Sequence, residues 1–167
     1  GKAAELRRRF PKASHIDAGT ATVVPGLIDA HAHVMGLGQA LMLADLSGAR
    51  SIEEVVERLR AFARTAPADA WIQGWGWDQN RWPGQAFPTT AELDAAFPDR
   101  PVWLSRIDGH AGWANSAALR AAEALPGARK LDGQWQPEGG RIVRDGARAS
   151  GVLVDEAMNL VQRAVPA

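Results

Sequence analysis

The chain has 167 residues, with 19 Lys and Arg against 19 Asp and Glu, so its formal net charge is zero. This length allows one domain with a real core, because a chain of this size buries about 70% of its unfolded surface. A neutral chain gives no electrostatic reason to expect nucleic acid or an anionic membrane as a partner. Cysteine is absent, which excludes disulfides, thiolate metal ligands and a Cys nucleophile. Any metal must be held by carboxylates and by the four histidines, His15, His31, His33 and His110.

The first part of the chain predicts one helix followed by extended segments. Helix formers occupy residues 3–10, and short β-like pieces follow over residues 15–24. The apolar run that begins at Leu27 is bounded by Gly and Pro, which is typical of a buried strand. No apolar run approaches the roughly 18 residues of a membrane span, so we expect no membrane partner.

The middle of the chain predicts helices with clear start signals and strands between them. Capping-box residues predict helices that begin at Ser51 and Thr89, and Asn115 is expected to cap a third helix. Residues 70–78 and 101–107 are predicted as strands.

The last part of the chain, after residue 126, is rich in Gly and charge. It predicts a hairpin at residues 141–143 and a helix from Val152 onward. In chain order, strands and helices alternate, which is typical of an α/β protein with parallel strands.

The pattern His31-Ala32-His33 predicts a metal site. In an extended strand, residues two apart point to the same face, so both imidazoles can reach one ion. The carboxyl end of a parallel strand is where α/β proteins place their chemistry. Asp29 lies one further step along this face and can orient an imidazole. The alternative is a pair of histidines with a structural place on the strand.

The sequence around these histidines resembles the strand-1 signature of the amidohydrolase superfamily, over the residues VPGLIDAHAH at 24–33. Further blocks resemble the branch that contains N-substituted formamide deformylase. They occur in the order of that family, at residues 74–78, 88–90, 93–94, 106–111, 113–116, 139–143 and 151–157. The resemblance therefore covers nearly the whole chain.

This resemblance implies a (β/α)8 TIM-type barrel flanked by a small β-sandwich, with one or two divalent metals, usually zinc, at the carboxyl face of the barrel. It implies a hydrolase that cleaves the C–N bond of a small amide, formamide or imide-like substrate with metal-activated water. Within it, His31 and His33 are expected as metal ligands, and His110 and Asp78 as residues at the substrate rim. The family takes its remaining ligands from later strands, as Lys or Glu, two His and Asp, but no His follows His110 in this chain.

The length predicts only part of such a barrel, because a complete one takes about 250 residues. We expect about the first three strand–helix units in residues 26–167, and a remnant of the sandwich in residues 1–25. The chain is then a catalytically incomplete portion of a hydrolase, completed by the remainder of that hydrolase or by a second copy. The alternative is a truncated, non-catalytic domain that folds or self-associates and at most binds a metal through His31 and His33.

Two further expectations concern the rim and the location of the protein. Four tryptophans lie in or near segments that follow strands, where they would line a substrate cleft or simply pack: Trp75, Trp77, Trp82 and Trp113. The polar residues of the rim also have structural alternatives. His110 can be a loop residue that hydrogen-bonds to the backbone, and Asp78 and Asp108 are of a residue type that forms turns.

We expect a cytoplasmic location, although the chain begins without Met and so does not test for a signal peptide.

Overall fold

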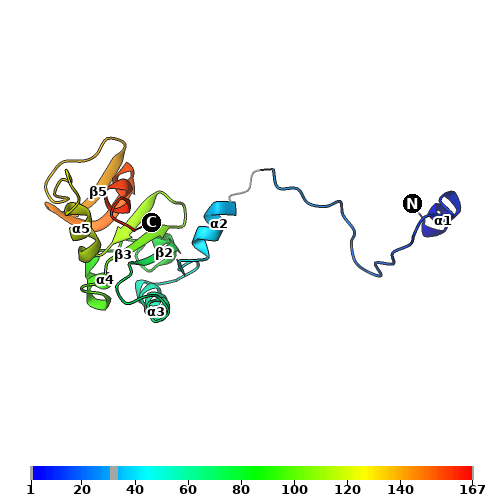
Figure 1. Ribbon diagram of the computed structural model, residues 1–167, viewed down its shortest axis with the longest axis horizontal. Helices are drawn as coiled ribbons and strands as arrows, with labels where there is room; N and C mark the ends of the chain where they lie inside the picture. The colour runs from blue at the N-terminus through cyan, green and yellow to red at the C-terminus, as the bar shows by residue number, and fades with distance from the viewer. Residues whose placement is uncertain (1, 31–33, 167) are drawn as a thin grey trace. The chain divides into compact units, whose positions relative to one another are not determined.

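The computed structural model describes residues 2–30 and 34–166 (Figure 1). It divides into two units, residues 1–32 and residues 33–167. In the first unit, α1 (Ala3–Arg9) confirms the predicted helix. Residues 15–24 contain no strand, so the prediction of β-like pieces there is wrong. Residues 27–30 contain none either, and the rest of that predicted strand, residues 31–33, lies outside the described residues. Leu27 and Ile28 are 95% and 90% exposed, because an apolar run becomes a strand only where another strand receives its hydrogen bonds.

The second unit is built on one six-stranded sheet with the order β1-β2-β3-β4-β6-β5. β1, β2 and β3 are parallel, whereas β4 pairs antiparallel with β3 and β6, and β5 pairs antiparallel with β6. The strands are β1 (Ala44–Asp45), β2 (Ile72–Trp77), β3 (Val102–Arg106), β4 (Ala111–Ala114), β5 (Gly140–Asp145) and β6 (Arg148–Asp155). Because two reversals separate β6 from β3, these strands run in the same direction and end at the same edge of the sheet.

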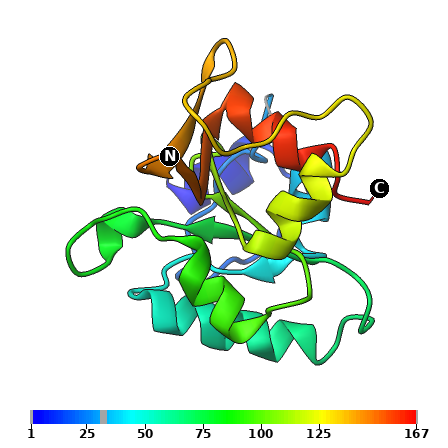
Figure 2. The same ribbon diagram turned by 90° about the vertical axis from the view of Figure 1, so that its left-hand side faces the viewer.

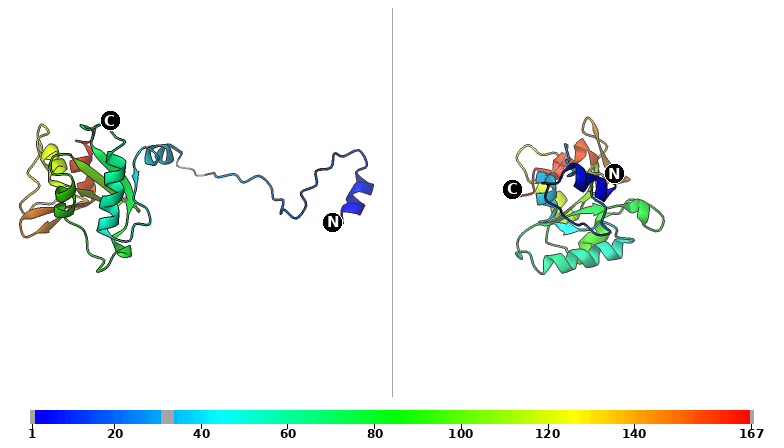
Figure 3. Two further views of the ribbon diagram at one scale, coloured as in Figure 1. Left: turned by 90° about the horizontal axis from the view of Figure 1, so that it is seen from below. Right: turned by 90° about the vertical axis from the view of Figure 1, so that its right-hand side faces the viewer.

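Helices cover both faces of this sheet (Figures 2 and 3). α3 (Ile52–Ala63) and α4 (Thr90–Ala96) lie on one side, and α5 (Ser116–Glu123) and α6 (Asn159–Gln162) lie on the other. The remaining elements are α2 (Val34–Ala40) and the short 3-10 helices η1 (Gln79–Arg81) and η2 (Glu156–Met158). Among the described residues, every helix is too short or too polar to cross a lipid bilayer.

The predicted helix starts are confirmed. Ser51 Oγ accepts from Glu54 N at 3.2 Å, and Thr89 forms a full capping box with Glu92. Asn115 Oδ1 accepts from Ala118 N at 3.0 Å and so caps α5. Each cap satisfies a backbone N–H that has no partner inside its helix.

Each face of the sheet has its own core. On the first face, Leu59 of α3 and Leu93 of α4 pack with Leu104 of β3. On the second face, Val161 of α6 packs with Leu153 of β6 and other buried residues of the same cluster. The predicted α/β class is thus confirmed. The expected parallel pairing holds for β1, β2 and β3 but not for β4, β5 and β6, which pair antiparallel, while the partial barrel and the sandwich remnant stay predictions.

The carboxyl-terminal part differs from the prediction in two respects. The predicted hairpin exists as β5 and β6, but β6 extends through Asp155, so the helix predicted from Val152 begins at Glu156. β4 was not predicted, because Ala-Gly-Trp-Ala lacks the alternation of a half-buried strand. All four of its residues are buried between two neighbouring strands, a position that local pattern does not reveal.

Candidate functional site at the carboxyl edge of the sheet

Charged residues gather where β2, β3 and β6 end. Asp78 follows β2, Asp108 lies two residues beyond the last residue of β3, and Asp155 is the last residue of β6. Arg106, which ends β3, lies within electrostatic range of all three carboxylates, and its pKa is raised by the hydrogen bond to Asp108 and then by the charges of all three. The parallel strands therefore bring residues that are distant in sequence to one edge, as they do at α/β active sites.

Arg106 and Asp108 form a two-pronged ion pair. Arg106 Nε donates to Asp108 Oδ1 at 2.9 Å, and Arg106 Nη2 donates to Asp108 Oδ2. The backbone N–H of His110 also donates to Asp108 Oδ1, at 3.0 Å. The guanidinium and then this amide hold the pKa of Asp108 below its usual range. Asp108 thus fixes the turn that leads from β3 to His110.

His110 pairs with Asp155 across the edge. His110 Nδ1 lies 2.9 Å from Asp155 Oδ1, and the backbone N–H of Asp155 donates to the carbonyl of His110 at 3.0 Å. An ionised carboxylate can only accept, so Nδ1 carries the proton and Nε2 is left as an acceptor in the neutral ring. The side chain of His110 is 70% exposed. Its Nε2 is therefore free to meet a ligand.

Asp155 has an unusual backbone conformation, with φ 50° and ψ −126°. Residues other than Gly seldom adopt positive φ, and holding one there costs about 1–3 kcal/mol. The double link to His110 holds Asp155 in this conformation. Such strain, at the end of a strand and in contact with an exposed His, is typical of functional sites.

A polar hollow of about 340 Å³ lies beside this pair. Within it, Asn159 Nδ2 donates to Glu156 Oε2 at 2.8 Å, so amide and carboxylate groups face the same space. Its lining residues are Gly109, His110, Gly139, Asp155, Glu156, Met158, Asn159 and Gln162. The hollow can therefore hold a polar group within reach of His110.

Asp78 has a defined structural task. Its carboxylate accepts from Asn80 N at 3.1 Å and so starts η1. This is the turn-forming alternative considered for it, and the same carboxylate also contributes to the field at Arg106. Asp78 thus lies at the predicted edge of the sheet, where its carboxylate accepts the hydrogen bond that starts η1.

The predicted metal ligands His31 and His33 lie outside the described residues. Within residues 2–30 and 34–166, no three His, Asp or Glu side chains come together as a metal site. The described residues therefore do not fit a complete catalytic zinc site, which takes three protein ligands and a water.

Three of the four tryptophans considered for a cleft are packed in the core instead. Trp77 and Trp113 are fully buried and Trp82 is 5% exposed. Their ring centroids lie 5.9 to 6.1 Å apart. Each indole N–H donates to a backbone carbonyl: Trp77 to Leu104, Trp113 to Thr89, and Trp82 to Ala49. Trp75 is half-buried. The packing alternative therefore holds for Trp77, Trp82 and Trp113.

Some of the sequence blocks that carry the family resemblance are structural. Asn115 is fully buried and uses its whole amide. Its Oδ1 accepts from the backbone of Val102 and Ala118, and its Nδ2 donates to the carbonyls of Phe97 and Arg100. These bonds tie α4, β3 and α5 together at the amino end of β3, the opposite end of the strand from His110.

Sequence reasoning missed Asp155 as a site residue. The available signal was an acidic residue in the block 151–157, directly after the apolar run of a predicted element. That element was predicted as a helix, which hid the position of Asp155 at a strand end.

The chain is similar in sequence to a known protein family and to several named proteins. The model of the family described as "Amidohydrolase family" matches residues 15–167. The chain is 35% identical to "Putative amidohydrolase YtcJ" of Bacillus subtilis (strain 168), covering 99% of this chain and 31% of that protein. It is 36% identical to "Protein LONG AFTER FAR-RED 3" of Arabidopsis thaliana, over 83% of this chain and 23% of that protein. It is 35% identical to "N-substituted formamide deformylase" of Arthrobacter pascens, over 92% of this chain and 28% of that enzyme.

Solved structures agree with these relatives. An uncharacterized metal-dependent hydrolase from Pyrococcus horikoshii OT3 superposes with a TM-score of 0.54 at 27% identity, over 81% of this chain and 23% of that one. Another, from Pyrococcus furiosus, has the same TM-score and identity, over 83% and 24%. The chain thus spans less than a third of the length of each of these relatives.

Proposed function

Because the chain belongs to the amidohydrolase family, we propose that it is part of a metal-dependent hydrolase that cleaves C–N bonds in small amide or formamide-like substrates. The observation that carries the proposal is the family match over residues 15–167, which includes both His31 and His33. The name of one relative, a deformylase of N-substituted formamides, supports the choice of bond. The names of the two solved structures support a divalent metal, and we propose zinc because the nitrogen donors of His suit it.

We further propose that residues 1–167 supply only part of the site. His31 and His33 are the metal ligands in this proposal, and catalytic zinc needs a third protein ligand. The chain spans less than a third of the length of its relatives. This supports the proposal that the remaining ligands come from a longer polypeptide, in which residues 26–167 form about the first three strand–helix units of a barrel and residues 1–25 belong to a small sandwich.

His110 and Asp78 are proposed as rim residues of this site. His110 Nε2 contacts the substrate or moves a proton, and Asp155 positions the ring through Nδ1. This arrangement is common for His, because a hydrogen bond from one ring nitrogen to a carboxylate fixes the tautomer and leaves the other nitrogen for chemistry. Asp78 supplies negative charge at the same edge. A cytoplasmic location and the absence of nucleic-acid and membrane partners remain predictions.

Metal binding by the chain itself tests the ligand assignment. Zinc binding is measured by equilibrium titration, because an incomplete set of ligands holds the metal weakly. The titration uses the chain, the double variant His31→Ala/His33→Ala, and His15→Ala as the matched control. We expect the chain and the control to bind zinc and the double variant to lose this binding. Stoichiometric zinc in the double variant would show that His31 and His33 are not the ligands.

The intact mass of the natural polypeptide tests the rest of the proposal. A mass near three times the 17.9 kDa of this chain, with bound zinc, is expected for a complete hydrolase. A natural mass of 17.9 kDa without metal would instead favour the non-catalytic, folded or self-associating domain.

A further inference from the structure

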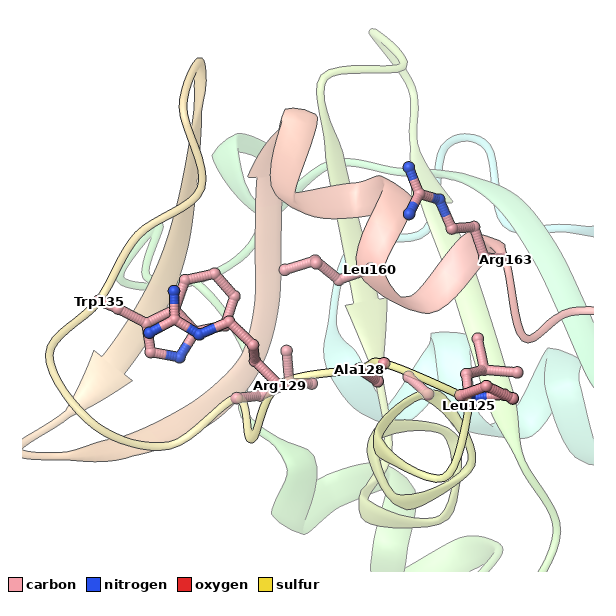
Figure 4. Close-up of a pocket in the computed structure, with 10 residues that line it drawn as sticks. Leu125, Ala128, Arg129, Trp135, Leu160 and Arg163 are labelled. Carbon is pink, nitrogen blue, oxygen red and sulfur yellow. The ribbon is translucent and has the colours of Figure 1, made fainter.

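A second pocket lies between α5, α6 and the loop that connects α5 to β5 (Figure 4). None of its lining residues belongs to the hollow beside His110. Its floor is apolar, since Ala122 and Leu131 are each 3% exposed and Leu160 comes from α6. Its volume is about 270 Å³, just below the roughly 300–1,000 Å³ of sites for drug-sized ligands. An occupant must therefore be small and largely apolar.

The rim of this pocket carries positive charge. The guanidinium of Arg129 lies 4.4 Å from the centroid of the Trp135 ring, and the two groups stack at one side of the pocket (Figure 4). Arg163 follows α6 at the other side. In the described part of the chain, neither guanidinium forms an ion pair with a carboxylate. Both charges are thus available to an anion.

A third guanidinium reinforces this positive charge from behind the pocket wall. Arg144 Nη2 donates to the carbonyls of Leu131 and Trp135, at 2.9 and 2.8 Å. Arg144 Nε is buried without a hydrogen-bond partner, and across residues 2–30 and 34–166 no carboxylate pairs with this side chain. A partly buried cation that lacks a counter-charge favours an anion nearby.

The wall is also held in place without a ligand. Trp135 Nε1 donates to the carbonyl of Lys130 at 2.7 Å. Glu123, a nearby carboxylate, is already used, because Oε1 accepts from Leu131 N and Oε2 pairs with Lys130 Nζ. A preformed wall reduces the ordering cost of binding.

We propose that this pocket binds a small organic monocarboxylate. Its ring or alkyl body lies on Ala122, Leu131 and Leu160, and its carboxylate meets Arg129. Arg suits this role because its planar fork matches a carboxylate with two parallel hydrogen bonds. The inference does not rest on the proposed hydrolysis, since the pocket uses different residues from the edge that carries His110.

Titration with benzoate, followed by NMR of the indole N–H groups, tests this inference. Benzamide serves as the uncharged ligand of similar shape, and Trp135→Phe assigns the Trp135 signal. We expect benzoate to shift that signal and benzamide to bind about tenfold more weakly, since hydrogen bonds to charged groups contribute more than neutral ones. Equal affinity for the two ligands, or an unmoved Trp135 signal at saturating benzoate, overturns the proposal.

Charge-removing variants complete the test. Arg129→Gln is expected to weaken benzoate binding about tenfold, while Arg129→Lys, which keeps the charge but loses the fork, is expected to lose less. Arg60→Gln, at an exposed position of α3, is the matched control and leaves affinity unchanged. Circular dichroism verifies that each variant is folded. Should Arg129→Gln unfold, rising salt must weaken benzoate binding to the unmodified chain; salt-independent binding overturns the proposal.

Discussion

His110 and Asp155 are joined twice at the carboxyl edge of the sheet. His110 Nδ1 lies 2.9 Å from Asp155 Oδ1, and the backbone N–H of Asp155 donates to the carbonyl of His110 at 3.0 Å. The second bond fixes the backbone of the two residues, and the first fixes the ring. An exposed imidazole that would otherwise rotate freely is thereby held with Nε2 directed away from its carboxylate partner.

Removing this carboxylate should change the tautomer of the ring. In the unmodified chain at alkaline pH, ¹⁵N NMR is expected to find the proton of His110 on Nδ1, because Asp155 accepts from it. Asp155→Ala removes the acceptor and should populate the Nε2–H form, whereas Asp155→Asn keeps an acceptor oxygen and should preserve Nδ1–H. Glu156→Gln, at the neighbouring exposed position, is the control. An unchanged tautomer in Asp155→Ala would contradict the positioning role.

The pair formed by Arg106 and Asp108 should make stability depend on pH in the acid range. The Arg106 guanidinium depresses the pKa of Asp108, so the ionised carboxylate is favoured in the folded state. This contribution is fully present above the unfolded pKa of Asp, about 3.9, and is lost as pH falls through the lower folded pKa. Because Asp108 is partly exposed, the effect should stay below about 1 kcal/mol.

An NMR titration of the side-chain carboxyl carbon measures this pKa directly. In Arg106→Gln, the pKa of Asp108 should rise toward its ordinary value, because the largest cause of its depression is gone. In Arg60→Gln, the pKa of Asp108 should be unchanged. A pKa that stays equally low in Arg106→Gln would assign the depression to the His110 backbone amide instead.

Asn115→Ala should strongly destabilise the fold. The change leaves two backbone N–H groups and two carbonyls without their side-chain partner and removes the cap of α5. We expect a loss of about 3 kcal/mol or more in the free energy of unfolding, measured by urea denaturation. Asn159→Ala, at an exposed site, is the control and should cost no more than about 0.5 kcal/mol. A similar small loss in both variants would contradict the structural role of Asn115.

Gly112 is required by the side chain that lies over it. A Cβ at this position would lie 1.9 Å from the ring of Trp103, so Gly112→Ala must displace a buried Trp. We expect a loss of about 1–3 kcal/mol, as for other overpacked cores. In a Trp103→Leu background the same substitution should cost much less, and a double-mutant cycle by thermal or urea unfolding measures the difference. Additive losses would show that the two residues do not interact.

Much of the local structure could be predicted from sequence. Ser51, Thr89 and Asn115 marked helix starts because a cap depends on a side chain and an N–H two or three residues away. The alternation of β2 and β3 with their helices could likewise be predicted, since the apolar periodicity that marks a strand or helix lies within that single element. His110 and Asp78 do lie beyond the carboxyl ends of strands, as the sequence predicts, while their role at a substrate rim stays a prediction.

The sequence alone determined the α/β class and the family, both of which rest on short-range order along the chain. The prediction that His31 and His33 are metal ligands rests on the same kind of local pattern. The tertiary structure decided what depends on partners distant in sequence. It packed Trp77, Trp82 and Trp113 in the core, which the sequence had left as one of two alternatives. It also added the antiparallel strands β4, β5 and β6 to the parallel strands and left Leu27 and Ile28 exposed. It also placed Asp155 beside His110, 45 residues away, because strand pairing brings together residues that no local pattern connects.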